Sequence, residues 1–210
     1  MNFKFKKFAL VLDIETLSVK SNAAISEIAL TFINLTNGEV EFVINQNFNT
    51  TQQIKDGFDY EDKTIEWLKK VLPESIYNQR EKMCSEVECN RNAFLELVQR
   101  VNLALKPFAE SDFNVYCKGG NFDYPILSNF SNFYLNKAIA FNWGFRQELC
   151  MRIFEDMFFN KEELKSIHEE IRVHVSSLVG YEVVPHVAVD DTLMEAEFLY
   201  RVYSHLSANL

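Results

Sequence analysis

The first third of the chain alternates apolar runs with turn residues, a pattern that predicts β-strands. The apolar runs cover residues 8–13, 24–34 and 40–45, and Asn37-Gly38 stands between the last two. An Asn-Gly pair between two such runs is a strong hairpin signal. Because the connections are short, we expect three consecutive strands in an antiparallel meander.

Further along the chain, the apolar residues change to helical spacing. Residues 65–72 and 94–105 each show this spacing and each precede a proline, so two amphipathic helices are expected there. Residues 113–117 are expected to form a short buried strand. A further helix is expected to begin at Asp123, and a last helix to span about 190–207. Strands, helix, strand, helix, loop and helix in this order fit an α/β fold with a mixed sheet.

Length and composition are those of one compact domain over residues 1–210. The chain is 48% hydrophobic, and no shift in composition or linker divides it. Its four cysteines show neither C-x-x-C spacing nor a nearby histidine cluster, which argues against a zinc site. Neither a signal peptide nor a membrane span is recognisable, so we expect a cytoplasmic protein that does not bind a membrane.

The formal net charge is −9, so the chain lacks the broad basic surface of proteins that bind nucleic acid by electrostatics alone. A nuclease is nevertheless compatible with this charge. A carboxylate cluster that holds divalent cations makes the formal sum negative while creating a positive site locally.

Several acidic residues stand at positions where they could converge. Asp13 and Glu15 are two residues apart at the end of the first expected strand, so their side chains share a face, roughly 7 Å apart at the backbone. Asp123 stands at a helix start, and His186 precedes Asp191 by five residues. Each has an ordinary explanation when taken singly: solvated loop acids, a helix N-cap, a surface histidine and a helix start favoured by the dipole.

The order of these residues along the chain is more specific than any one of them. It resembles the three exonuclease motifs of the DEDDh family, within the RNase H-like fold. Within that family, the chain is most similar to the bacteriophage exonuclease A group and its relatives described as 3′-to-5′ exoribonucleases. The motif segments are Asp13-Ile14-Glu15-Thr16, Asn121-Phe122-Asp123 and His186-Val187-Ala188-Val189-Asp190-Asp191.

The resemblance implies a mixed central sheet with three antiparallel N-terminal strands and flanking helices. It also implies an enzyme that releases nucleoside 5′-monophosphates with two divalent cations, Mg²⁺ or Mn²⁺. Asp13 would bridge both cations, and Glu15 and Asp191 would complete the site that activates water. Asp123 would serve the cation at the leaving group. His186 would be the general base, since histidine titrates near neutral pH.

The resemblance also implies contacts with the substrate, which would be the 3′ end of RNA or DNA. Thr16 and Leu17 would lie beside the terminal nucleotide, and Arg146 and Lys118 are candidates for phosphate contacts. Both nucleic acids stay open, because no motif reveals a contact to the 2′-hydroxyl. Residues 160–184 match no family segment and are a candidate homodimer interface.

Two other hypotheses remain at this stage. The chain could be a non-catalytic nucleic-acid-binding module that retains the RNase H-like fold, although a relic has no chemical need for all five residues. It could also be a scaffold with chance acidic residues, in which case the motif positions would be scattered in space.

Overall fold

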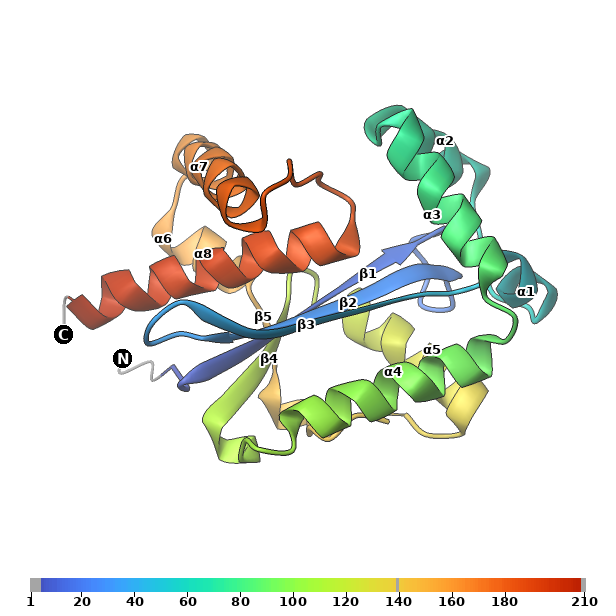
Figure 1. Ribbon diagram of the computed structural model, residues 1–210, viewed down its shortest axis with the longest axis horizontal. Helices are drawn as coiled ribbons and strands as arrows, with labels where there is room; N and C mark the ends of the chain where they lie inside the picture. Colours follow the sequence, from blue (N-terminus) through green and yellow to red (C-terminus); the bar gives the residue numbers. More distant parts are fainter. Residues whose placement is uncertain (1–4, 139, 209–210) are drawn as a thin grey trace.

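The fold is built on one five-stranded mixed sheet with helices on both faces (Figure 1). The computed structural model describes residues 5–138 and 140–208; the outer ends of the expected domain, 1–4 and 209–210, lie outside them. The strand order is β3-β2-β1-β4-β5, with β1 antiparallel to β2 and parallel to β4. The strands are β1 (Phe8–Thr16), β2 (Ile25–Asn34), β3 (Glu39–Asn47), β4 (Phe113–Cys117) and β5 (Glu148–Cys150).

The helices form a layer on each face of the sheet. In Figure 1, α6, α7 and α8 lie above the sheet, α4 and α5 below it, and α1 to α3 beyond one end. No helix of the described residues is long and apolar enough to cross a membrane. The helices are α1 (Thr50–Lys55), α2 (Asp62–Val71), α3 (Glu74–Glu86), α4 (Asn90–Leu105), α5 (Asp123–Leu135), α6 (Arg152–Phe158), α7 (Lys161–Val179) and α8 (Ala188–Ala208), with 3₁₀ turns at η1 (Glu110–Asp112) and η2 (Phe145–Gln147).

The alternation of side chains along β1 explains where its carboxylates point. Leu10 and Leu12 enter the core shared with α4 and α5, whereas Ala9 and Val11 enter the core shared with α8. Because successive strand residues face opposite sides, the odd-numbered positions that follow also face α8. The two acidic residues of β1 therefore end the row that points toward that helix.

The three N-terminal strands and their antiparallel order are confirmed, and so are the helices expected around 65–72 and 94–105. At the hairpin, Gly38 has a φ of +75°, and a Cβ there would lie 2.9 Å from the ring of Tyr200. Glycine meets both demands, since it adopts positive φ without a side-chain clash. The sequence reading missed α1, α3, α6, α7 and β5.

Candidate active site

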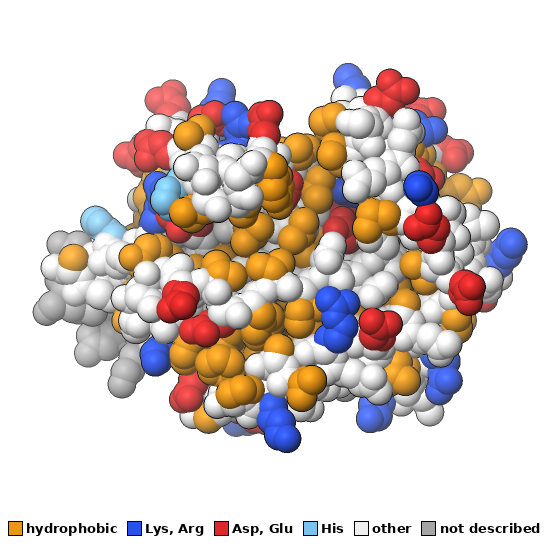
Figure 2. Space-filling view, in the orientation of Figure 1, with side chains coloured by type: hydrophobic (Ala, Val, Ile, Leu, Met, Phe, Trp, Pro, Cys, Tyr) orange, Lys and Arg blue, Asp and Glu red, His pale blue; other side chains and the backbone are white. Residues whose placement is uncertain are grey.

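The carboxyl ends of β1 and β4 open into a cleft of about 1830 Å³. Such crevices beyond the carboxyl ends of strands are where α/β sheets bind ligands. The walls come from α2 on one side and from α6 and α7 on the other. Figure 2 shows the hollow between two raised regions of the surface. All five residues of the motifs line this cleft, which contradicts the hypothesis of scattered acidic residues: Asp13, Glu15, Asp123, His186 and Asp191.

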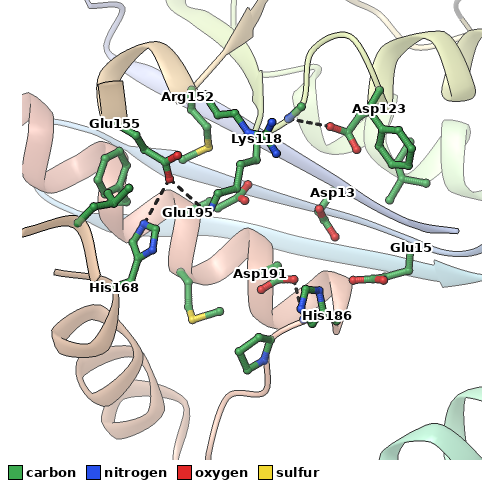
Figure 3. Close-up of a pocket in the computed structure, with 18 of the residues that line it drawn as sticks. Asp13, Glu15, Lys118, Asp123, Arg152, Glu155, His168, His186, Asp191 and Glu195 are labelled. Carbon is green, nitrogen blue, oxygen red and sulfur yellow. Dashed lines mark hydrogen bonds and ion pairs between the residues drawn. The ribbon is translucent and has the colours of Figure 1, made fainter. Parts of the chain in front are cut away.

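Helix α8 brings the last carboxylate to the end of β1. It packs across β1 and β2, where the hydroxyl groups of Thr31 and Thr192 form a hydrogen bond of 2.9 Å. The neighbouring Asp190 accepts hydrogen bonds from Tyr181 and from the N–H of Val184, and so holds the preceding loop. Asp191, one residue on, is left to face the cleft (Figure 3).

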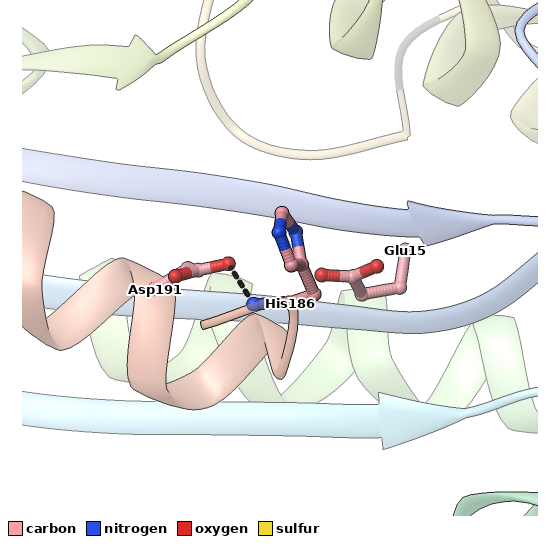
Figure 4. A group of neighbouring side chains, drawn as sticks. All are labelled: Glu15, His186 and Asp191. Carbon is pink, nitrogen blue, oxygen red and sulfur yellow. Dashed lines mark hydrogen bonds between the residues drawn. The ribbon is translucent and has the colours of Figure 1, made fainter. Parts of the chain in front are cut away.

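His186 lies in the loop before α8, with its backbone in the left-handed region at φ +66°. Both of its main-chain groups are held. Its N–H donates to Asp191 Oδ2 at 2.9 Å (Figure 4), and its carbonyl accepts from the Arg80 guanidinium. The imidazole packs against Trp67, with 4.7 Å between ring centroids. The main chain of His186 is thus held at two points, and its ring is held by one contact at the cleft.

Asp123 is the first residue of α5, and the sequence left open that it caps the helix. The helix has no side-chain cap; Asp123 Oδ2 instead accepts from the N–H of Gly119 at 3.1 Å. That bond ties the carboxylate to the turn after β4. Asp123 is 5% exposed and is therefore buried at the wall of the cleft.

The donor set fits divalent cations. Glu15, His186 and Asp191 each offer a ligand atom within 4.8 Å of the others. Asp13 Oδ2 is buried without a hydrogen-bond partner. An unpaired buried carboxylate oxygen is costly unless a cation or proton satisfies it. Carboxylate oxygens are the ligands that hard cations such as Mg²⁺ and Mn²⁺ prefer.

Burial is the main influence on the titration of this cluster. It raises the pKa of Asp13 well above its usual value, and the charges of Glu15 and Glu195 raise it further. Burial raises the pKa of Glu15 to about 7, although Arg80 opposes the change. It also raises the pKa of Asp123 to about 6 and that of Asp191 to about 6. The cluster thus resists carrying all its negative charges without cations.

The metal-free chain is therefore expected to lose stability as the pH rises from about 4 to about 7. Unfolded Asp and Glu titrate near pH 4. A carboxyl group whose pKa is higher in the folded than in the unfolded state stabilises the fold most at a pH below its unfolded pKa. This stabilisation is lost as the pH rises through the folded pKa, which is about 7 for Glu15 and about 6 for Asp123 and Asp191. The lowered pKa of His186 acts oppositely, but it is one group against several.

Thermal unfolding in a chelating buffer at several pH values measures this effect. Added Mg²⁺ is expected to restore most of the loss at pH 8, because cations bind the deprotonated carboxylates. A melting temperature that rises with pH in the chelating buffer would contradict the interpretation.

Arg80 of α3 is a buried cation that the sequence analysis missed. It is 6% exposed, and its guanidinium lies 3.7 Å from Glu15 and 3.8 Å from Glu27. Glu27 pairs with Glu15 in the register of β1 and β2, and its carboxylate accepts a hydrogen bond of 3.4 Å from the N–H of Ala188. One arginine thus links two strands, the His186 loop and the start of α8.

Replacing Arg80 by Gln is expected to lower the free energy of unfolding by about 3 kcal/mol, because two buried carboxylates lose their cation. Chemical denaturation at pH 7.5 measures the change. Lys82→Gln on the same helix removes an exposed ion pair with Glu86 and is expected to cost less than about 1 kcal/mol. Equal losses of stability in the two variants would show that Arg80 stabilises the fold no more than an exposed ion pair does.

The residues expected to contact substrate divide into two groups. Thr16 and Lys118 line the cleft, and the Thr16 hydroxyl donates to the carbonyl of Ser18 at 2.8 Å. Leu17 and Arg146 are absent from the described lining. Leu17 is packed in the core under β1, and the Arg146 guanidinium lies 5.8 Å from the centroid of the Phe145 ring, in η2.

The wall formed by α6 and α7 contains further polar residues that the sequence analysis missed. Lys118 and His168 both lie 3.3 Å from Glu155 Oε1, and Glu195 of α8 faces the same region (Figure 3). Burial raises the pKa of Glu155, but His168 and Lys118 outweigh it and lower the pKa overall. Glu195 follows Asp191 by one helical turn, but this spacing alone does not distinguish it from an ordinary charged residue of a helix. The segment 160–184, which the sequence analysis offered as a candidate homodimer interface, contributes part of this wall through α7.

Solved structures share the fold along nearly the whole chain. The nuclease domain of 3′hExo, a DEDDh family member bound to rAMP, superposes with a TM-score of 0.61 at 12% identity, covering 96% of this chain and 94% of that one. E. coli exonuclease I in complex with a dT13 oligonucleotide gives a TM-score of 0.60 at 12% identity over 94% of this chain, but only 41% of its own. At these identities the likeness supports the RNase H-like exonuclease fold.

Comparison of sequences gives a more specific result. No curated protein matches the chain significantly. The family model described as "3'-5' exoribonuclease Rv2179c-like domain" matches residues 9–202. The match includes every motif residue and both walls of the cleft.

Proposed function

Since the chain belongs to the 3′-5′ exoribonuclease Rv2179c-like family, it is a 3′-5′ exonuclease of the DEDDh type, and we propose that it hydrolyses RNA from the 3′ end with two divalent cations. The products would be nucleoside 5′-monophosphates. One observation carries the proposal: residues of three separate motifs converge in one cleft, where Asp13 Oδ2 is buried without a partner.

The four carboxylates would hold the cations. In Figure 3, Asp13 lies between the other three carboxylates, with Glu15 and Asp191 toward His186 and Asp123 on the opposite side. When bound, divalent cations neutralise the phosphoryl oxygens, lower the pKa of water and stabilise the leaving oxygen. Glu15 would be kept in place by Arg80, and Asp123 by the Gly119 N–H.

His186 would accept the proton of the attacking water. Burial, together with the charges of Arg80 and Lys118, lowers the pKa of His186, so its imidazole is neutral near pH 7 and can take a proton. As the water oxygen bonds to phosphorus, the bond between phosphorus and the 3′-oxygen breaks. The 3′-oxygen takes up a proton and leaves as the new chain end.

The size of the cleft favours a polymer as substrate. Small-molecule pockets measure about 300–1,000 Å³, whereas this cleft measures about 1830 Å³. Thr16 at the end of β1 would contact the terminal nucleotide, and Lys118 would contact a phosphate. One of the superposed structures is bound to rAMP and another to a dT13 oligonucleotide, and the family description favours RNA.

The experiment uses one 20-nucleotide sequence as RNA and as DNA, labelled at either end, with Mg²⁺, Mn²⁺ or a chelator. We expect 3′-labelled RNA to release labelled mononucleotide at once and 5′-labelled RNA to give a shortening ladder. The chelator is expected to stop both. Faster digestion of DNA would overturn the RNA assignment. Binding without shortening under every condition would instead favour the non-catalytic binding module.

A further inference from the structure

A fifth carboxylate, that of Glu195, enters the cleft from α8. It follows Asp191 by four residues, so both side chains lie on one face of the helix. Glu195 is 7% exposed and lines the cleft. None of the three motifs includes it, and no role described so far requires an acid there.

The Glu195 carboxylate lacks the partners that normally accompany a buried charge. Its Oε2 is buried without a hydrogen-bond partner, and Glu195 takes part in no ion pair among the described residues. Lys118 is close enough for its charge to act on Glu195, but its Nζ is paired with Glu155 at 3.3 Å. A buried carboxylate left in this condition is destabilising unless a cation or a proton satisfies it.

Asp13, a neighbour of Glu195 in the cleft, also has a buried carboxylate oxygen, Oδ2, without a partner. The charges of Asp13 and Glu195 act on each other. In Figure 3, Glu195 and Glu15 lie to either side of Asp13. Glu15 belongs to the group with His186 and Asp191, whose ligand atoms lie within 4.8 Å of one another. Glu195 thus offers an oxygen on the side of Asp13 that this group leaves open.

We propose that Glu195 is a further ligand of the metal centre and shares with Asp13 one of the two divalent cations. This inference rests on the proposed function, because it needs cations in the cleft. It makes the centre one of five carboxylates, with two of them supplied by consecutive turns of α8. The competing role is structural: Glu195 would then only balance the charge of Lys118.

Mn²⁺ titration of the full chain tests the proposal without an activity readout. Free Mn²⁺ measured by electron paramagnetic resonance, together with calorimetry, gives the number and affinity of the sites. We expect two Mn²⁺ per wild-type chain. In Glu195→Gln, one site is expected to weaken by about tenfold or more, as loss of groups at a metal site commonly does. Glu197→Gln is the matched control, because Glu197 pairs with Arg201 and does not line the cleft.

The outcomes separate the two proposals. Unchanged affinities in Glu195→Gln overturn the inference and leave the proposed function standing. A wild-type chain that binds no Mn²⁺ overturns both. If Glu195→Gln does not fold, anomalous scattering from wild-type crystals soaked in Mn²⁺ decides. A peak within about 2.5 Å of a Glu195 oxygen supports the proposal, and peaks only beyond about 4 Å reject it.

Discussion

Asp13→Asn is expected to lower the rate of nucleotide release by about three orders of magnitude or more. The substitution keeps the size of the side chain but removes the charge from the centre of the carboxylate cluster, where Oδ2 has no other partner. Electrostatic groups that stabilise a transition state commonly contribute factors of this size, and here the same group would also hold the cations. The initial rate on 5′-labelled RNA at saturating Mg²⁺ measures the loss.

The fold is expected to survive this substitution. Because burial and the charge of Glu15 raise the pKa of Asp13, removal of its charge relieves repulsion, and the melting temperature in a chelating buffer should rise or stay the same. Asp156→Asn is a suitable control, since Asp156 is exposed on α6 and outside the cleft lining. Retention of more than about a tenth of the wild-type rate by Asp13→Asn would remove Asp13 from the proposed mechanism.

His186→Ala is expected to lower the rate by about 10²- to 10⁴-fold, the usual contribution of a general base. The pH profile carries the sharper test. The wild-type rate should fall as the pH drops through the pKa of His186, which burial, Arg80 and Lys118 lower below its ordinary value. Protonation removes the base, so the loss lies on the acid side. In His186→Ala, the decrease in rate that protonation of His186 causes at low pH should be absent.

The control for this experiment is His174→Ala, because His174 is exposed on α7 and does not line the cleft. Its rate and profile should match the wild type. A His186→Ala variant with lower substrate affinity but an unchanged maximal rate and acid limb would assign His186 to binding instead.

The sequence predicted the three N-terminal strands well because their pattern is local. Asn37-Gly38 and the apolar runs on either side of it specify a hairpin without help from distant residues. Helix α3 was not predicted, because most of its residues are polar and only Arg80 and Cys84 are buried. Helix α7 carried a readable signal in the capping box of Asn160 and Glu163, and Gly180 ends it at φ +79°.

The candidate site was predictable to the extent that its residues belong to motifs. Asp13 and Glu15 follow from strand geometry, whereas the nearness of Asp123 and His186 came from the family resemblance. Arg80 and Glu195 could not be found in this way, because each resembles an ordinary charged residue of a surface helix. Their burial results from contacts between elements that are far apart along the chain, which no local pattern records.

The position of β1 at the centre of the sheet also has a consequence for the cell. Asp13 and Glu15 belong to β1, which the ribosome makes before α8, whereas Asp191 belongs to α8, which completes the cleft over β1. A nascent chain that ends before α8 lacks one of the four motif carboxylates and the loop that presents His186. The growing polypeptide would therefore lack the proposed activity until translation has passed α8.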